Sequence, residues 1–178
     1  MRELATRARI QQLLGALAAV ADAPTTVYLV GGTTAVLVGW RDSTRDVDLV
    51  IRPESDALLR ALPALKGRLS LNIELAAPDQ FIPVAPGWEA RSPVVARLGP
   101  VTVCHYDLTA QALAKIERGH TRDLADVHAM LAAGLVTPAG LRAAYEAAAE
   151  GLYRYPAVDP VSYRRAMEAL LAEDGGKG

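Results

Sequence analysis

The chain has 178 residues, 51% of them hydrophobic, and a formal net charge of −1 at pH 7. This length is typical of one domain, or of one domain with a helical appendage, and the high apolar fraction excludes a largely disordered chain. A net charge near zero argues against a general nucleic-acid coat protein. A local basic patch is still compatible with the sequence, because 16 of its 19 basic residues are arginine.

The expected location follows from the single cysteine and from the first residues. Cys104 cannot form an internal disulfide, which indicates a reducing cytoplasm. Basic residues before the apolar stretch 13–21 imitate a secretory signal, but Glu3 and Gln11 interrupt it and its leucines recur at helical spacing. No uninterrupted apolar run reaches 18 residues, so we expect a cytoplasmic protein with no membrane span.

The predicted elements begin with an amphipathic helix over residues 3–22, which Pro24 ends. They continue with a strand at 26–31, a helix at 33–40, a strand at 45–52, a helix from 53 to about 62 and a strand from about 69 to 76. Residues 77–93 contain four prolines and two large aromatic residues, which predicts an ordered loop. A hairpin is predicted from strands at 94–98 and 101–106.

From Asp107 onward the apolar residues recur with a helical period. The predicted openings of four helices are Thr109, Thr121, Thr137-Pro138 and Asp159-Pro160, with a frayed tail at 174–178. This order predicts an α/β (α+β) fold. A mixed sheet with flanking helices occupies residues 1–107, and a C-terminal helical segment, residues 108–178, packs on that core.

Two carboxylates stand in a strand that otherwise has the composition of a buried one. Asp46 and Asp48 are two residues apart, so their side chains project to the same face. Like charges this close favour a divalent cation held by oxygen ligands, Mg²⁺ or Mn²⁺. The alternative is structural: one aspartate is an edge charge and the other caps a helix or forms a salt bridge.

A glycine pair, separated from Asp46 by thirteen residues, strengthens the metal interpretation. Gly31-Gly32 follows the apolar strand and opens a helix, and such a turn lets the backbone approach a phosphate. Thr33 or Thr34 can add a hydroxyl. We assign Gly31, Gly32, Thr33 and Arg45 to nucleotide binding, although a Gly-Gly pair is more often only a turn.

Glu74, in the strand predicted at 69–76, is the candidate third carboxylate. With Asp46 and Asp48 it would complete a two-metal site that holds the attacking and leaving oxygens. The alternative is an outward-facing charge on an edge strand.

The helical half has its own candidate site residues. Lys115 is the one lysine predicted in mid-helix, and its compact ammonium suits a triphosphate, although a surface lysine is the alternative. Asp123 and Asp126 are three apart and share a helix face. Asp123 lies near the predicted start of its helix, where a carboxylate is favoured for structural reasons. We therefore assign Asp126 to catalysis, although the choice between the two stays open.

These motifs resemble those of known families. Val30-Gly31-Gly32, followed by Asp46-Val47-Asp48-Leu49-Val50, resembles the nucleotidyltransferase superfamily that includes DNA polymerase beta. Lys115 with the later Asp123-x-x-Asp126 resembles AbiE-type and MenT-type toxin nucleotidyltransferases. Three further segments are similar to small bacterial nucleotidyltransferases of unknown function: Asn72–Leu75, Phe81–Pro83 and Tyr153–Pro156.

The resemblance implies a nucleotidyltransferase-type sheet and transfer of a nucleoside monophosphate from an NTP to a hydroxyl, with release of pyrophosphate. It places Mg²⁺ on Asp46, Asp48 and Glu74, the triphosphate at Gly32 and Thr33, and Lys115 on a phosphate, with Asp126 as the late acidic residue. The implied acceptor is RNA, at a tRNA 3′ end, for a toxin that pairs with an antitoxin protein. The alternatives are a small acceptor, as in aminoglycoside adenylyltransferases, and a non-catalytic module that binds a nucleotide or a partner.

The remaining polar residues are less informative. The three histidines and Cys104 lack the spacing of a zinc site. Arg154, Arg164 and Arg165 can contact the phosphates of an acceptor, but a solvated helix face is the favoured explanation.

Overall fold

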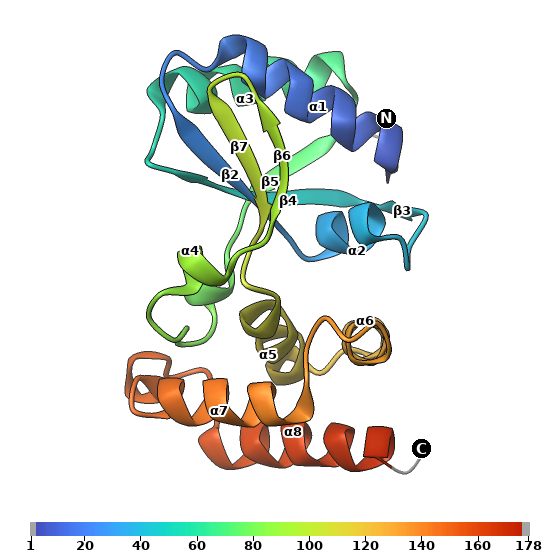
Figure 1. Ribbon diagram of the computed structural model, residues 1–178, viewed down its shortest axis with the longest axis vertical. Coiled ribbons are helices and arrows are strands. Elements are labelled where there is room, and N and C mark those ends of the chain that lie inside the picture. Colours follow the sequence, from blue (N-terminus) through green and yellow to red (C-terminus); the bar gives the residue numbers. More distant parts are fainter. Residues whose placement is uncertain (1–2, 176–178) are drawn as a thin grey trace. The chain divides into compact units, whose positions relative to one another are not determined.

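The computed structural model describes residues 3–175, which divide into two compact units (Figure 1). Residues up to 77 and 92–106 form the first unit, and residues 78–91 and 107 onward form the second. The segment 78–91, which we placed with the sheet, therefore belongs with the helices. The predicted packing of the helical segment on the sheet core stays a prediction.

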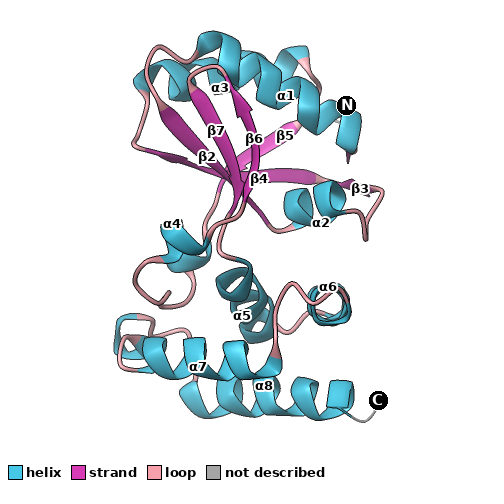
Figure 2. Cartoon of the chain, in the orientation of Figure 1, coloured by secondary structure: helices cyan, strands magenta, loops and turns pink. Residues whose placement is uncertain are grey.

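The first unit contains the strands and three helices (Figure 2). Its elements are β1 (Ala5–Thr6), α1 (Arg7–Val20), β2 (Thr25–Val30), α2 (Gly32–Val38), β3 (Ser43–Thr44), β4 (Asp46–Arg52), α3 (Asp56–Arg68), β5 (Asn72–Leu75), β6 (Val94–Leu98) and β7 (Val101–His105). Five strands form one sheet in the order β5-β4-β2-β7-β6, and β1 pairs with β3 separately. The β2–β4 and β6–β7 pairs are antiparallel, whereas β2–β7 and β4–β5 are parallel. The predicted mixed sheet is confirmed.

The core lies on one face of this sheet, where α1 and α3 cover it (Figure 1). Along β4, Val47 and Leu49 are fully buried and Ile51 is nearly so, all within this core. Burying one such side chain stabilises the fold by about 1.5–3 kcal/mol. Because side chains alternate along a strand, Asp46 and Asp48 project to the opposite face.

Helix α3 differs from its predicted boundaries for identifiable reasons. It begins after Ser55, whose hydroxyl accepts a hydrogen bond from the N–H of Leu58. We expected it to end at about residue 62, but it continues to Arg68 with Pro63 inside. Leu65 continues the buried stripe beyond the proline, and that burial offsets the hydrogen bond that proline cannot donate. The next strand, β5, is accordingly shorter than predicted.

The second unit contains the helical elements (Figure 2). They are the short helical turn η1 (Pro78–Gln80), α4 (Trp88–Arg91), α5 (Leu108–Arg118), α6 (Thr121–Ala132), α7 (Pro138–Ala149), the short turn η2 (Leu152–Arg154) and α8 (Pro160–Gly175). The loop 77–93 is thus ordered as predicted, and it contains helical turns that we did not predict. Of the tail predicted at 174–178, α8 includes the first two residues, and 176–178 lie outside the described part of the chain. No helix within residues 3–175 is long and apolar enough to cross a membrane.

Two predicted helix caps are wrong and two are confirmed. Asp107, not Thr109, caps α5: its carboxylate accepts hydrogen bonds from the N–H groups of Thr109 and Ala110, because a carboxylate at this position satisfies the exposed donors of the first turn. The N-cap of α6 is the residue before Thr121. Thr137 caps α7 through the N–H of Gly140, and Asp159 accepts from the first turn of α8.

Candidate active site

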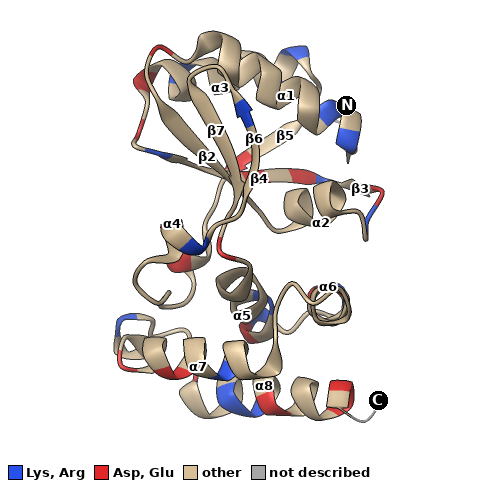
Figure 3. Ribbon diagram, in the orientation of Figure 1, with Lys and Arg blue, Asp and Glu red and all other residues tan. Residues whose placement is uncertain are grey.

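The two aspartates of β4 share the face of the sheet opposite the core. Asp46 and Asp48 are half-buried, while Val47 between them is fully buried. Figure 3 shows the acidic positions on β4. The predicted common face of the two carboxylates is therefore confirmed.

The register of β5 adds a third carboxylate to this face. β5 runs parallel to β4 and pairs Asp48 with Glu74. Directly paired residues on neighbouring strands project to the same side of a sheet. Glu74 therefore lies beside the aspartates, and it is also exposed on an edge strand. The exposed position on an edge strand is the one that the structural alternative expected. The role of Glu74 as the third metal-binding carboxylate stays a prediction.

Asn72 connects these carboxylates, and the sequence reasoning gave it no role at the site. It pairs with Asp46 across the β4–β5 ladder. Its side-chain Nδ2 donates to Asp46 Oδ1 at 2.6 Å and to Glu74 Oε1 at 2.8 Å. The two-residue spacing of Asn72 and Glu74 indicated that their side chains share a face of the strand. Only the register with β4 shows that this face is also the one that carries the aspartates.

The glycine turn lies directly against Asp48. Gly31 has φ +60°, in the left-handed region that favours glycine. A Cβ built on Gly31 would lie 3.1 Å from Asp48 Oδ2. The strand pairing agrees, because Val30 on β2 is opposite Asp48 on β4. The glycine turn and the Asp-x-Asp strand, which are separated in the sequence, are therefore in contact in the structure.

The second glycine is required by packing. A Cβ on Gly32 would overlap the side chain of Thr44. The hydroxyl of Thr44 donates in turn to the carbonyl of Asp46 at 3.1 Å. Gly32 therefore lets the start of α2 lie close to the segment that leads into β4.

The two threonines after the glycines have different partners. The Thr33 hydroxyl, fully buried, accepts a hydrogen bond from the N–H of Asp48 at 3.1 Å. The Thr34 hydroxyl donates to the carbonyl of Leu29 at 3.1 Å and contacts Nδ1 of His105 at 3.1 Å. Thr33 is thus the threonine linked to the aspartates, and its predicted contact with the triphosphate stays a prediction.

A small hollow opens beside Asp46. It has a volume of about 290 Å³ and is lined by Glu3, Leu4, Arg45, Asp46 and Asn72. Arg45 is exposed there, next to Asp46 in the sequence. A cation at the edge of a carboxylate site is suitably placed to bind an anionic ligand, so the assignment of Arg45 to nucleotide binding stays a prediction with compatible geometry.

The predicted residues of the helical unit form a buried ionic cluster. Lys115 Nζ lies 2.6 Å from Asp126 Oδ2 and 3.4 Å from Asp123 Oδ1. Lys115 is 5% exposed and Asp126 2% exposed, so the interpretation of Lys115 as a surface lysine is wrong. Arg118 forms a bidentate pair with Asp123, at 2.8 Å from Nε and 2.7 Å from Nη2.

The charge of Asp123 is set by these neighbours. Burial acts to raise the pKa of Asp123, but the hydrogen bond from Arg118 and the charges of Lys115 and Arg118 outweigh it and lower the pKa. Both aspartates are therefore bound by cations within this unit, and Lys115 lies closer to Asp126. Whether Asp123 or Asp126 is the late acidic residue stays open, as does the predicted contact of Lys115 with a phosphate.

Residues 7–164, most of the chain, match the model of a family described as "nucleotidyltransferase of unknown function" (DUF6036). The chain belongs to this family. No curated protein and no solved structure matches the chain. The family description agrees with the superfamily resemblance of the Gly-Gly and Asp-x-Asp motifs and with the general reaction type.

The donor set of this nucleotidyltransferase family member suits Mg²⁺. In the described residues, no group of three or more histidine, cysteine or acidic residues is arranged to hold a metal ion by itself. Mg²⁺ sites at phosphate-transferring centres use one or two carboxylates together with the phosphates of the substrate, and Asp46 with Asp48 supplies such a pair. The assignment of Glu74 as a further metal ligand stays a prediction.

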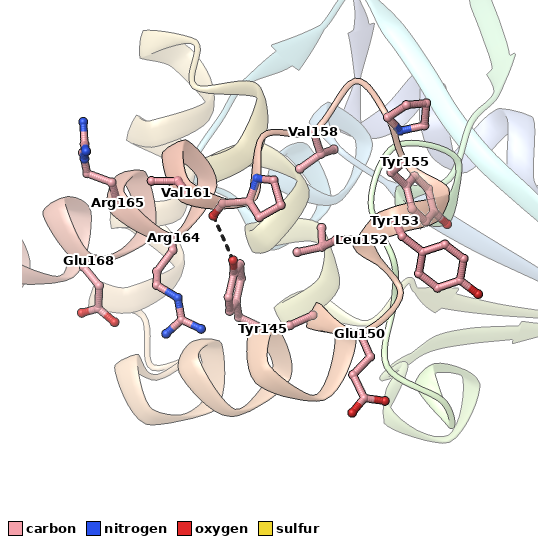
Figure 4. Close-up of a pocket in the computed structure, with 13 residues that line it drawn as sticks. Tyr145, Glu150, Leu152, Tyr153, Tyr155, Val158, Val161, Arg164, Arg165 and Glu168 are labelled. Atoms are coloured by element: carbon pink, nitrogen blue, oxygen red, sulfur yellow. Dashed lines mark hydrogen bonds between the residues drawn. The ribbon is translucent and has the colours of Figure 1, made fainter.

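The helical unit of this family member also carries a groove at η2 and the neighbouring parts of α7 and α8 (Figure 4). Its volume is about 860 Å³, and the Tyr145 hydroxyl donates to the carbonyl of Pro160 within it. Arg164 lies 5.0 Å from the centre of the Tyr145 ring and pairs with Glu146 at 2.7 Å. Arg154 stacks on Tyr153. These local partners favour the solvated-face interpretation of Arg154 and Arg164 over phosphate contacts.

Proposed function

We propose that this protein is a Mg²⁺-dependent nucleotidyltransferase that moves a nucleoside monophosphate from an NTP to a hydroxyl acceptor and releases pyrophosphate. The observation that carries the proposal is the contact between the Gly31 turn and the Asp48 carboxylate, on the face that Asp46 shares. The glycine turn allows the backbone to approach a phosphate, and the carboxylates beside it are of the kind that binds Mg²⁺. Both lie together in a member of a nucleotidyltransferase family.

Each residue of the first unit has a distinct part in this proposal. Asp46 and Asp48 would hold Mg²⁺, which when bound would neutralise charge at the phosphate and lower the pKa of the attacking hydroxyl. Gly31 and Gly32 leave room for the triphosphate, and Thr33 fixes the backbone of Asp48. No covalent intermediate on the protein is required.

Lys115 and Asp126 complete the proposal in the second unit. Lys115 neutralises charge on the departing pyrophosphate, and Asp126 is the late acidic residue. Because their side chains form a 2.6 Å ion pair, this role requires that Lys115 exchange part of that pairing for the phosphate. The proposed role of Lys115 thus requires a change in its ion pairing, whereas the proposed role of Asp46 and Asp48 does not.

For the acceptor we propose RNA, at a tRNA 3′ end, with the protein as the toxin of a toxin–antitoxin pair. The support is the resemblance of Lys115, Asp123 and Asp126 to the late motifs of toxin nucleotidyltransferases. A small hydroxylated molecule is the second candidate, and a non-catalytic nucleotide-binding module is the third.

The test is transfer of label from each of the four α-³²P-labelled NTPs to total RNA in the presence of Mg²⁺. We expect a labelled RNA band with the wild type and none with Asp46→Asn/Asp48→Asn. The matched control is Asp22→Asn, which makes the same chemical change at an exposed aspartate after α1 and should label RNA like the wild type.

The negative outcomes separate the candidates. Absence of RNA labelling together with pyrophosphate release in the presence of small hydroxylated compounds would replace RNA by a small acceptor. Nucleotide binding without any pyrophosphate release would refute the enzyme and favour the binding module. Growth arrest on expression, relieved by Asp48→Ala, would support the toxin role.

A further inference from the structure

The amide of Asn72 joins two carboxylates that come from different strands. Asp46 is on β4 and Glu74 is on β5, and the parallel register places Asn72 beside the first and two residues before the second. A side-chain amide nitrogen carries two protons. The two bonds from Nδ2, of 2.6 Å to Asp46 and 2.8 Å to Glu74, assign one proton to each carboxylate.

A neutral donor has a particular electrostatic effect at this position. Carboxylates on neighbouring strands of one face repel each other. A lysine or arginine between them would relieve the repulsion by neutralising charge, and would compete with a divalent cation for the same oxygens. The amide of Asn72 draws Asp46 and Glu74 together and leaves their negative charge in place to attract a cation.

The amide also fixes the orientation of each carboxylate. Hydrogen bonds from neighbouring groups hold metal-binding side chains in position, and removing such a group typically lowers metal affinity about 10- to 100-fold. Asn72 binds Oδ1 of Asp46 and Oε1 of Glu74. The second oxygen of each carboxylate then binds the ligand, and the hydrogen bond from Asn72 sets the direction in which that oxygen points.

We propose that Asn72 is a positioning residue of the metal site: it holds Asp46 and Glu74 in the spacing and orientation in which they bind a divalent cation together. This inference rests on the proposed function and deepens it. It also assigns Glu74 to the same cation site as Asp46, through an amide that binds both. Asn72 itself touches neither the cation nor the substrate in this role.

The test compares Asn72→Ala, which removes both hydrogen bonds, with Asn72→Gln, which keeps two amide protons on a longer side chain. Binding of Mn²⁺ to the free protein is measured by electron paramagnetic resonance, without nucleotide. We expect Mn²⁺ affinity to fall about tenfold or more in Asn72→Ala and to recover in part in Asn72→Gln. Leu75→Ala, an exposed position on the same strand, controls for disturbance of β5.

A second readout separates positioning from a general loss of structure. The Mg²⁺ concentration for half-maximal label transfer should rise about tenfold in Asn72→Ala, while the rate at saturating Mg²⁺ stays near that of the wild type. Mn²⁺ affinity unchanged in both Asn72 variants would overturn the positioning role and leave the proposed function intact. If the wild type binds no Mn²⁺ without nucleotide, the positioning role is overturned, and the label-transfer test decides the proposed function separately.

Discussion

The hydroxyl of Thr33 accepts a hydrogen bond from the backbone N–H of Asp48, 15 residues later, at 3.1 Å. This bond ties the start of α2 to β4 at the residue whose carboxylate faces Gly31. The position of Asp48 is therefore determined both by its own strand and by a side chain in the first turn of α2.

Replacing Thr33 by valine should destabilise the protein and disturb the site together. Valine keeps the shape of threonine but removes the acceptor for the Asp48 N–H in a fully buried position, at a cost of about 1–3 kcal/mol. Urea unfolding measures the loss of stability, and label transfer measures the loss of activity. Thr33→Ser keeps the hydroxyl and should retain most of the activity; equal losses in the two variants would contradict the assigned hydrogen bond.

Gly31→Ala should lower both stability and activity. The residue has φ +60°, and the added Cβ would meet Asp48 Oδ2 at 3.1 Å, so we expect a cost of about 1–3 kcal/mol for the backbone conformation alone. The comparison is Gly15→Ala within α1, where nothing lies within 4 Å of the added Cβ. There the same change should stabilise the helix by about 0.5–1 kcal/mol. Similar thermal shifts in the two variants would argue against strain at Gly31.

Lys115→Met should destabilise the protein strongly, whatever its effect on catalysis. It leaves Asp126, which is 2% exposed, without its 2.6 Å cationic partner, and breaking a buried pair in this way costs about 3–5 kcal/mol. Lys115→Met/Asp126→Leu removes the stranded charge and should recover most of that loss. Lys66→Met, at a half-buried lysine of α3, should stay within about 0.5 kcal/mol of the wild type. No recovery in the double variant would contradict the pairing.

His105 should make the stability depend on pH between about 6.5 and 4. The Thr34 hydroxyl donates to Leu29, so it accepts from His105 Nδ1–H, which assigns the proton of the neutral ring to Nδ1. Burial lowers the pKa of His105 to about 4, below its ordinary value of 6.5. The unfolded chain then binds the proton first as the pH falls, so stability decreases across this interval, by on the order of 3 kcal/mol.

The check is the urea midpoint of the wild type and of His105→Asn at pH 7 and at pH 4. Asparagine keeps an N–H close to the position of Nδ1 but does not titrate. The fall in stability between the two pH values should therefore be smaller in the variant. The same fall in both proteins would show that other groups cause it.

The local elements could largely be predicted from the sequence, because their causes are local. The alternation of apolar residues around Asp46 and Asp48 predicted a strand with both carboxylates on one face, and the structure agrees. The predicted end of a helix at about residue 62 was wrong: α3 continues through Pro63 to Arg68, because burial along its apolar stripe outweighs the local penalty of the proline. The cap of α5 was predicted at Thr109 and lies at Asp107, because the carboxylate accepts hydrogen bonds from the first turn of the helix.

The sequence by itself determined the chemistry available: the glycine turn, the two aspartates two residues apart and a lysine followed by an Asp-x-x-Asp helix. Only the tertiary structure decided which of these residues meet. The register that brings Asn72 and Glu74 beside the aspartates depends on how α3, which connects β4 to β5 in the chain, packs on the sheet. A shift of one residue would turn Glu74 to the other face. The burial of Lys115 between Asp123 and Asp126 likewise depends on the packing of α5 against α6. Packing of this kind sums many distant contacts, each too weak to be recognised in the local pattern of the chain.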